Sequence, residues 1–193
     1  MISGDEIQNP KANPCRDEEG HGDEGQTMTG QLLYSCDYST DLCGAVTDFW
    51  RQETAPAAGR PVSGPVTGSN NNKGYSYFPS VDCRQPGDTY NVDITFSSQP
   101  PDTYLSQCCL LFSFHVWGPD IGEISLDHLR ASNRLEKAIW RIPMSLNDRW
   151  YRAQVMLKNC GTKVTFRGTC GTSLKSDLAL DDVAVYAQQC PGE

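Results

Sequence analysis

The feature that most constrains the fold of this chain is a period of two in its apolar residues, repeated in short segments from residue 32 onward. In one segment Tyr90, Val92, Ile94 and Phe96 alternate with polar residues, and residues 151–157 alternate in the same way. Such alternation is typical of a strand with one face in a core and one face in solvent. Turns containing Gly or Pro separate the segments. The pattern predicts an antiparallel β-sandwich.

A nearly continuous apolar segment, residues 108–117, is long enough for a central strand of that sandwich. Only residues 128–138 offer a helical interpretation, and this segment is short and weakly amphipathic. The predicted fold class is therefore all-β.

One predicted strand changes its alternation partway. Leu178 and Leu180 share one parity, whereas Val183 and Val185 share the other. An extra residue shifts the register by one, so a bulge at Asp181 and Asp182 would return both apolar pairs to the core. Bulges often redirect side chains near functional sites, which makes these two carboxylates candidates for cation binding or for capping loop amides.

The first 31 residues differ from the rest in composition. They hold seven acidic residues against Lys11 and Arg16, a net charge of −5, and they contain few apolar residues. Such a segment buries too little surface to offset the entropy lost on ordering. We therefore expect an acidic, flexible tail or linker over residues 1–31 and a sandwich domain over residues 32–193.

The charge and hydropathy of the whole chain exclude two classes of partner. The net charge is −8 and the pI is about 4.8, which argues against general binding of nucleic acid. The sequence has no apolar run of 18 residues, so we expect no membrane insertion by this segment.

Nine cysteines are dispersed among Gly- and Pro-rich turns, without the paired spacing of a zinc finger. This usage indicates disulfides formed in an oxidising compartment. No signal peptide is visible at the N-terminus. We therefore expect a secreted or cell-surface segment whose leader has been removed, with Met1 an added residue.

The sequence favours a protein without catalytic activity. It contains no nucleophile elbow, zinc-protease helix, phosphate-binding loop or dinucleotide fingerprint. His115 lies in the middle of the predicted central strand, opposite in parity to the core face. We interpret it as a surface or edge histidine rather than a catalytic base.

Several motifs, read in order, resemble a known extracellular module. They are residues 36–38 (CDY), 42–44 (LCG), 49–50 (FW), 74–77 (GYSY), 109–118 (CLLFSFHVWG), 164–168 (VTFRG) and 177–183 (DLALDDV), with Trp150, Val155, Leu157 and Cys190 in the expected succession. This order and spacing resembles the MAM domain, the module named for meprin, the A5 antigen (neuropilin) and receptor phosphatase mu. The resemblance runs from Leu33 to Cys190 and implies a jelly-roll-like β-sandwich used in adhesion.

The resemblance also implies two disulfides, Cys36–Cys43 and Cys109–Cys190. Strand parity raises an alternative at the second, because Cys108 rather than Cys109 shares the parity of Phe112 and Phe114. We keep Cys109 for the family bond, since strand ends bend easily.

Five cysteines then remain: Cys15, Cys83, Cys108, Cys160 and Cys170. They allow two further pairs and one spare thiol, with the pairing open. Cys15, in the tail, is the candidate for the spare and for an intermolecular bridge.

A cation site is a further implication of the resemblance. Asp37, Ser39 and Asp181 (or Asp182) come from the strands that carry the family's site, and the ligand would be Ca²⁺ or another cation. No cofactor is otherwise indicated. The chain departs from the family pattern in two places: Ser39 replaces an acidic residue, and the family's Asp-His-Thr segment has no counterpart in residues 61–73.

Two functions fit these observations. The first is an extracellular adhesion or recognition module that binds another protein or a second copy of itself. The alternative is a lectin-like sandwich that binds carbohydrate, because this fold supports unrelated binding roles. Of the four tryptophans, Trp50 and Trp150 are interpreted as structural, and Trp117, at a strand end, as the candidate exposed binding aromatic.

Overall fold

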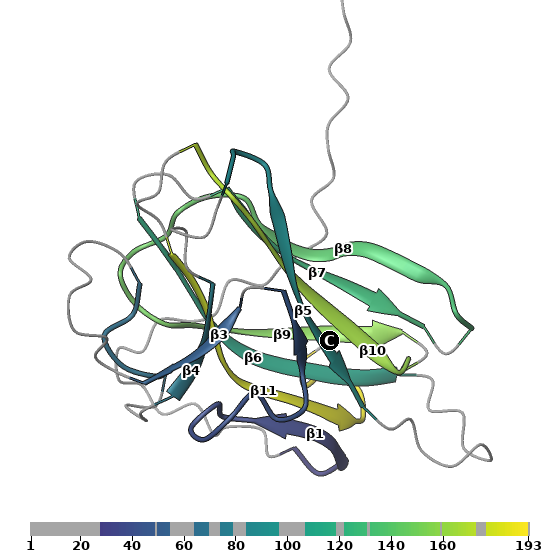
Figure 1. Ribbon diagram of the computed structural model, residues 1–193. Helices are drawn as coiled ribbons and strands as arrows, with labels where there is room; N and C mark the ends of the chain where they lie inside the picture. Colours follow the sequence, from purple (N-terminus) through teal and green to yellow (C-terminus); the bar gives the residue numbers. More distant parts are fainter. Residues whose placement is uncertain are drawn as a thin grey trace, which may run out of the picture.

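The computed structural model describes residues 28–48, 50–54, 64–69, 74–78, 84–96, 107–118, 122–130, 132–158, 160–172 and 177–192. Within these residues all regular structure is β-strand, arranged in two antiparallel sheets (Figure 1). The strands are β1 (Gln31–Cys36), β2 (Val46–Thr47), β3 (Arg51–Thr54), β4 (Gly74–Phe78), β5 (Thr89–Thr95), β6 (Gln107–Trp117), β7 (Glu123–Leu129), β8 (Leu135–Ile142), β9 (Tyr151–Lys158), β10 (Lys163–Thr169) and β11 (Asp177–Ala187).

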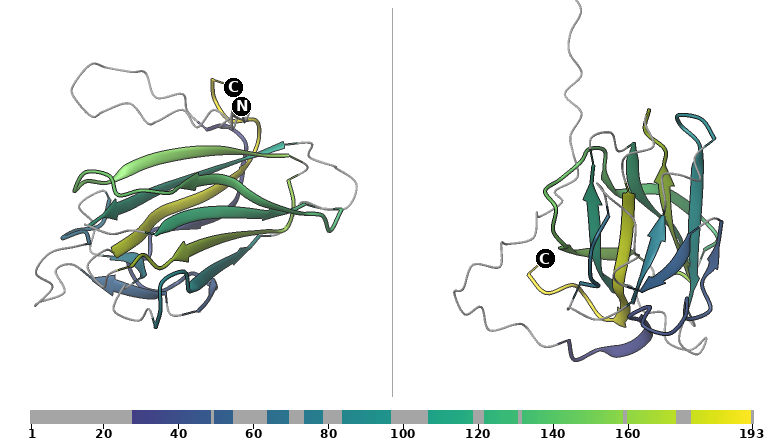
Figure 2. Two further views of the ribbon diagram at one scale, coloured as in Figure 1. Left: turned by 90° about the horizontal axis from the view of Figure 1, so that it is seen from above. Right: turned by 60° about the vertical axis from the view of Figure 1, so that its left-hand side comes forward.

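The two sheets are stacked as two layers (Figure 2). The first sheet has the order β3-β4-β11-β6-β9, with β1 also paired to β11, and the second has the order β2-β5-β10-β7-β8. Most neighbouring strands are not consecutive in sequence, so the chain crosses repeatedly between the layers. The predicted all-β, jelly-roll-like sandwich is confirmed.

The core lies between the sheets and consists of the apolar residues that alternate along each strand. Phe112 of β6 contacts both Phe166 of β10 and Trp140 of β8, each with ring centroids 4.9 Å apart in an edge-to-face arrangement. Such aromatic pairs add roughly 0.5–1.5 kcal/mol beyond the area that they bury. This cluster therefore joins β6 of the first sheet to the middle strand β10 and the edge strand β8 of the second.

The bulge predicted in the last strand is present. The pairing of β11 with β6 shifts register between Asp181 and Ala184, and Asp182 has a φ of 47°. Before the shift β11 pairs with β4, and after it β11 pairs with β1. Leu178, Leu180, Val183 and Val185 are all buried, as the change of parity predicted.

The described residues of the segment 128–138 form strand and turn, in agreement with the predicted all-β class. Residues up to Leu129 continue β7, and β8 begins at Leu135. A turn between them is closed by hydrogen bonds from Asn133 N to Arg130 O (2.9 Å) and from Arg130 N to Arg134 O (3.0 Å). The end of β7 pairs with β10 on one side and with β8 on the other. These two strands satisfy its backbone groups, so no helical hydrogen bonds are needed.

Three disulfides connect described residues: Cys36–Cys43, Cys108–Cys160 and Cys109–Cys190, with Cα atoms 5.8, 4.9 and 4.8 Å apart. The first and third are the pairs that the family resemblance implies. The second lies inside the core, consistent with the parity of Cys108. Cys170 is also disulfide-bonded. Cys15 and Cys83, including the predicted spare thiol, lie outside the described residues.

The first and last described segments of the chain lie side by side. Gln31 of β1 is opposite Ala187 of β11, and Thr29 N donates to the Gln188 side-chain oxygen at 2.9 Å. The end of the predicted tail nearest the domain therefore contacts the sandwich, whereas residues 1–27 of that tail lie outside the described residues.

Candidate functional site

The outer face of the first sheet is covered in its middle by the chain itself. His115 of β6 and Ala179 of β11 point away from the core, yet they are 1% and 0% exposed. The segment 64–69 lies against this face, because Trp150 Nε1 donates to Thr67 O at 2.8 Å and Ser69 N donates to Asp181 Oδ2 at 2.7 Å. A partner therefore has little access to the centre of this face.

The interpretation of His115 as a surface or edge histidine is wrong. Its ring packs edge-on to Trp150, with centroids 5.6 Å apart, and its Nε2 lies 3.0 Å from Asp148 Oδ1. Sequence parity placed the side chain outside the core correctly, but it could not show that residues 148–150 cover it. The His115–Asp148 contact thus ties residues 148–150 to β6, with the imidazole buried beneath them.

The two carboxylates at the bulge of β11 hold the covering segment in place. Asp181, which is fully buried, accepts from Ser69 N, and Asp182 accepts from the Ser69 hydroxyl. Burial raises the pKa of Asp181 from 3.8 to about 6, while the Ser69 amide opposes the shift. The folded protein therefore holds the Asp181 proton more tightly than the unfolded chain does. This difference stabilises the fold below pH 3.8, and the stabilisation is lost as the pH rises through about 6.

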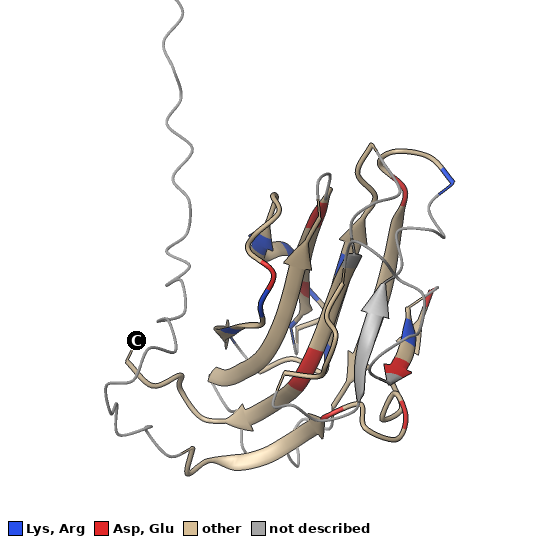
Figure 3. Ribbon diagram, turned by 90° about the vertical axis from the view of Figure 1, so that its left-hand side faces the viewer, with Lys and Arg blue, Asp and Glu red and all other residues tan. Residues whose placement is uncertain are grey.

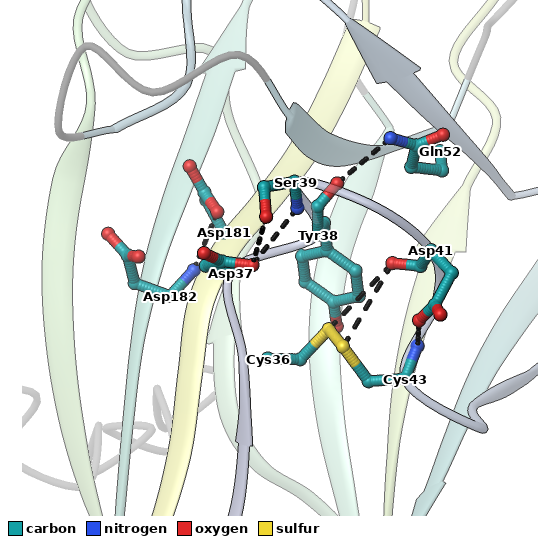
Figure 4. Close-up of a disulfide and its surroundings, with 9 residues drawn as sticks. All are labelled: Cys36, Asp37, Tyr38, Ser39, Asp41, Cys43, Gln52, Asp181 and Asp182. Carbon is teal, nitrogen blue, oxygen red and sulfur yellow. Dashed lines mark hydrogen bonds between the residues drawn. A yellow bond between two sulfur atoms is a disulfide. The ribbon is translucent and has the colours of Figure 1, made fainter.

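The other predicted cation residues lie beyond the end of β1, beside the Cys36–Cys43 disulfide (Figure 4). Asp37 Oδ1 accepts from both the amide and the hydroxyl of Ser39, at 3.0 and 2.8 Å, and these bonds hold the Asp37 pKa below 3.8. In the part of the chain that the structure describes, no three His, Cys, Asp or Glu side chains gather as metal ligands do. Protein donors already bind Asp37 Oδ1, Asp181 Oδ2 and Asp182 Oδ2, so a cation at these oxygens would have to share or displace those donors.

This arrangement predicts that calcium leaves the stability of the domain unchanged. We expect the same Tm in millimolar CaCl₂ and in excess chelator, measured by thermal unfolding. A ligand at a hundred times its Kd would stabilise the fold by about 2.7 kcal/mol and raise Tm by several degrees. A rise of that size, absent from Asp181→Asn, would show that a cation displaces the Ser69 donors.

The outer face of the second sheet is polar and carries paired charges. Lys163 of β10 bonds Asp93 of β5, and Arg167 Nη2 lies 2.6 Å from Asp127 Oδ2 of β7. A third pair joins Arg141 Nε and Glu123 Oε2 at 3.5 Å. The strand register places these side chains in neighbouring rows, and charged residues of both signs lie on the strands (Figure 3).

This second face differs from the first in exposure. The Arg141 side chain is 55% exposed at the β8 edge, and Val46 is 69% exposed at the β2 edge. Between them Ser125 and Asp127 are buried by their longer neighbours. The face thus carries polar side chains at its centre and exposed side chains at both edges. Sequence reasoning did not identify it, because the outward parity of a strand does not show which face the loops leave open.

The tryptophans do not form an exposed platform within the described residues. Trp50 and Trp140 are buried, and Trp117 and Trp150 are half-buried. Trp117, the predicted exposed aromatic, therefore offers only part of its ring to solvent. Trp50 Nε1 donates to Tyr90 O at 3.1 Å, which gives this side chain a structural role.

The fold and its crosslinks define a class: a disulfide-bonded antiparallel β-sandwich module. Within that class the chain belongs to the MAM domain family, since the family model "MAM domain, meprin/A5/mu" matches residues 33–191. A similar curated relative is MAM domain-containing protein 2 from Mus musculus, 28% identical over 162 residues, or 81% of this chain. The match spans only 23% of that relative's length.

Solved structures share the fold at low identity. One is the K1 cleaved adhesin domain of Lys-gingipain from Porphyromonas gingivalis, with a TM-score of 0.51, 17% identity, and coverage of 82% of this chain and 99% of that one. Another is a Clostridium thermocellum xylanase with its CBM22-1 module, complexed with xylohexaose, with a TM-score of 0.53, 11% identity, and coverage of 86% and 30%. At these identities the likeness shows the fold alone.

The described part of the chain contains no helix with the length and apolar character needed to span a membrane.

Proposed function

We propose that this chain is a non-catalytic extracellular recognition module, which binds protein through the outer face of the second sheet. The observation that carries the proposal is the contrast between the two outer faces. Segment 64–69 covers the first, whereas the second presents a polar surface with an exposed rim. Membership of the MAM family and the disulfides, which persist in oxidising compartments, support the extracellular location.

The chemistry of this face suits a protein partner. Non-obligate interfaces are about as polar as the rest of a protein surface, and arginine is enriched in them. Arg141 is exposed and its contact with Glu123 is 3.5 Å long, so a partner carboxylate can compete for the guanidinium. Because the face carries both signs of charge, a second copy of the chain can supply complementary groups. We therefore propose homophilic binding as the version to test first.

Self-association at high micromolar concentration tests this version. We expect light scattering after size exclusion to show a dimer that dissociates as salt rises, because the Debye length shortens from about 10 Å at 0.1 M to about 3 Å at 1 M. Arg141→Glu should weaken the association about tenfold or more, since it places like charges together.

The matched control is Lys158→Glu, which makes the same charge change on an exposed residue of β9 in the first sheet. It should leave association unchanged. A strict monomer at these concentrations would overturn the homophilic version. Equal effects of the two substitutions would overturn the assignment of the face.

Carbohydrate binding is the alternative proposal, and the likeness to a xylanase carrying a CBM22-1 module supports it at the level of fold only. Sugar stacking uses exposed aromatic rings, and Trp117 is half-buried. If the chain binds sugars, a glycan array should give a signal that Trp117→Ala abolishes. A blank array would count against the alternative and leave the protein-binding proposal standing.

A further inference from the structure

His128 is a buried histidine whose ring is not hydrogen-bonded within the described structure. It lies on β7 with the parity of the core residues Ile124 and Leu126, and it is 1% exposed. Neither Nδ1 nor Nε2 has a hydrogen-bond partner there. A neutral imidazole in this position already lacks the bonds that buried polar groups normally make.

Two charged side chains face the ring from the strands beside it. Glu136 of β8 is opposite His128 in the sheet, and its Oε2 lies 4.0 Å from His128 Nδ1. Arg130, just beyond β7, donates to the other oxygen of Glu136. The remaining neighbour in the sheet, β10, places Val164 opposite the histidine. The Glu136 oxygen that faces Nδ1 is therefore too distant for a hydrogen bond, and the carboxylate is held by Arg130 through its other oxygen.

The other side of the ring is closed by the turn between β9 and β10. A Cβ placed on Gly161 would lie 2.6 Å from His128 Nε2 and 1.9 Å from Leu129 O, so only glycine allows this approach. The turn is held by Thr162 N, which donates to Leu129 O, and by Thr162 O, which accepts from Phe96 N. The Cys108–Cys160 disulfide ties the same turn to β6.

We propose that His128 makes this end of the sandwich sensitive to acid: proton uptake by the imidazole opens the turn at residues 160–162. An imidazolium has two N–H donors, and in the described structure Nε2 is buried beneath the closed turn without a hydrogen-bond acceptor. A buried charge without hydrogen-bond acceptors is strongly unfavourable. Moving the turn away from the ring admits water, while the Cys108–Cys160 disulfide keeps the opening local.

The direction of the pH dependence follows from the ring's surroundings. Burial lowers the pKa of His128 below its ordinary value of 6.5; Glu136 opposes this shift and Arg130 adds to it. As the pH falls, His128 therefore takes up a proton at a higher pH in the unfolded chain than in the folded protein. Stability from the neutral ring is fully present above pH 6.5 and is lost as the pH falls toward the lowered value, with at most about a tenfold rise in the unfolding constant per pH unit.

The test compares the wild-type chain with His128→Phe, which keeps a planar ring but cannot bind a proton. The unfolding constant is measured by denaturant unfolding at pH 7.5 and at pH 5.5. Its increase on acidification should be at least about five times as large for wild type as for His128→Phe. Asp181 titrates near pH 6 with the opposite sign. It is present in both chains, so the difference between them isolates His128. His21→Gln, which removes a histidine from the tail, is the control and should behave as wild type.

A second measurement needs no variant. Hydrogen exchange of the Thr162 and Phe96 amides, corrected for intrinsic rates, should lose about tenfold or more of its protection between pH 7.5 and 5.5. Core amides of β6 exchange through global unfolding and should lose less, in step with the unfolding constant. Equal pH dependence of wild type and His128→Phe would overturn the proposal. Should His128→Phe fail to fold, unchanged protection at Thr162 would overturn it by itself.

Discussion

Replacing both Cys109 and Cys190 by alanine should lower the free energy of unfolding by about 4.5 kcal/mol in the chain-entropy model. The two residues are 81 apart in sequence, so the bond removes a large loop-closure entropy from the unfolded chain. It also joins the start of β6 to the segment that follows β11, the pair of strands at the centre of the first sheet. We expect this to be the most damaging single crosslink to lose, measured by denaturant unfolding.

The Cys36–Cys43 bond provides the matched comparison. Its two cysteines are only 7 residues apart in sequence, so the bond closes a short loop. The same model predicts that the corresponding double alanine variant loses about 2.5 kcal/mol of unfolding free energy. Both variants remove one bond and two sulfurs, so the comparison isolates loop length. Equal losses, or a larger loss for Cys36–Cys43, would show that denatured-state structure or local contacts outweigh closure entropy.

The second large effect should come from Asp127→Ala, which we expect to destabilise the fold by about 3 kcal/mol. The Asp127 side chain is 5% exposed and accepts from Ala138 N at 2.8 Å and from Arg167 at 2.6 Å. Ala138 has a φ of 48° next to the register shift between β7 and β8. Removing the carboxylate leaves this strained amide and the half-buried guanidinium without their acceptor.

Asp93→Ala is the control for this prediction. Asp93 makes the same kinds of bond, to Lys163 and Thr165, but its side chain is 29% exposed. Water replaces the lost contacts there, and we expect a cost of about 1 kcal/mol or less. Asp127→Asn should fall between the two, because an amide oxygen can still accept from Ala138. A loss at Asp127→Ala no larger than at Asp93→Ala would contradict the importance of burial.

The proposed recognition face and the acid-sensitive histidine lie on the same sheet. His128 and Asp127 are neighbours on β7, with side chains on opposite faces. Opening the turn at residues 160–162 would disturb the start of β10, which carries Lys163 on the outer face. If both proposals hold, acid should weaken binding at this face. Their tests remain separate, because self-association and the stability difference are measured independently.

The two-layer β architecture could be predicted from the sequence, because the alternation of apolar and polar residues along a strand can be read from each segment separately. The bulge at Asp181 and Asp182 could also be predicted, since a change of parity within one strand has few other solutions. Residues 128–138 were harder to assign from the sequence, because a short, weakly periodic segment takes its structure from the strands beside it.

Which outward- and inward-facing groups are covered could be seen only in the three-dimensional structure. His115 and His128 have opposite parities and both are buried, one under residues 148–150 and the other under the turn at Gly161. The Cys108–Cys160 pair likewise required two segments 52 residues apart to meet. These outcomes depend on where distant loops come to rest on the sheets. Such placement is set by long-range packing, which the local period of a sequence does not encode.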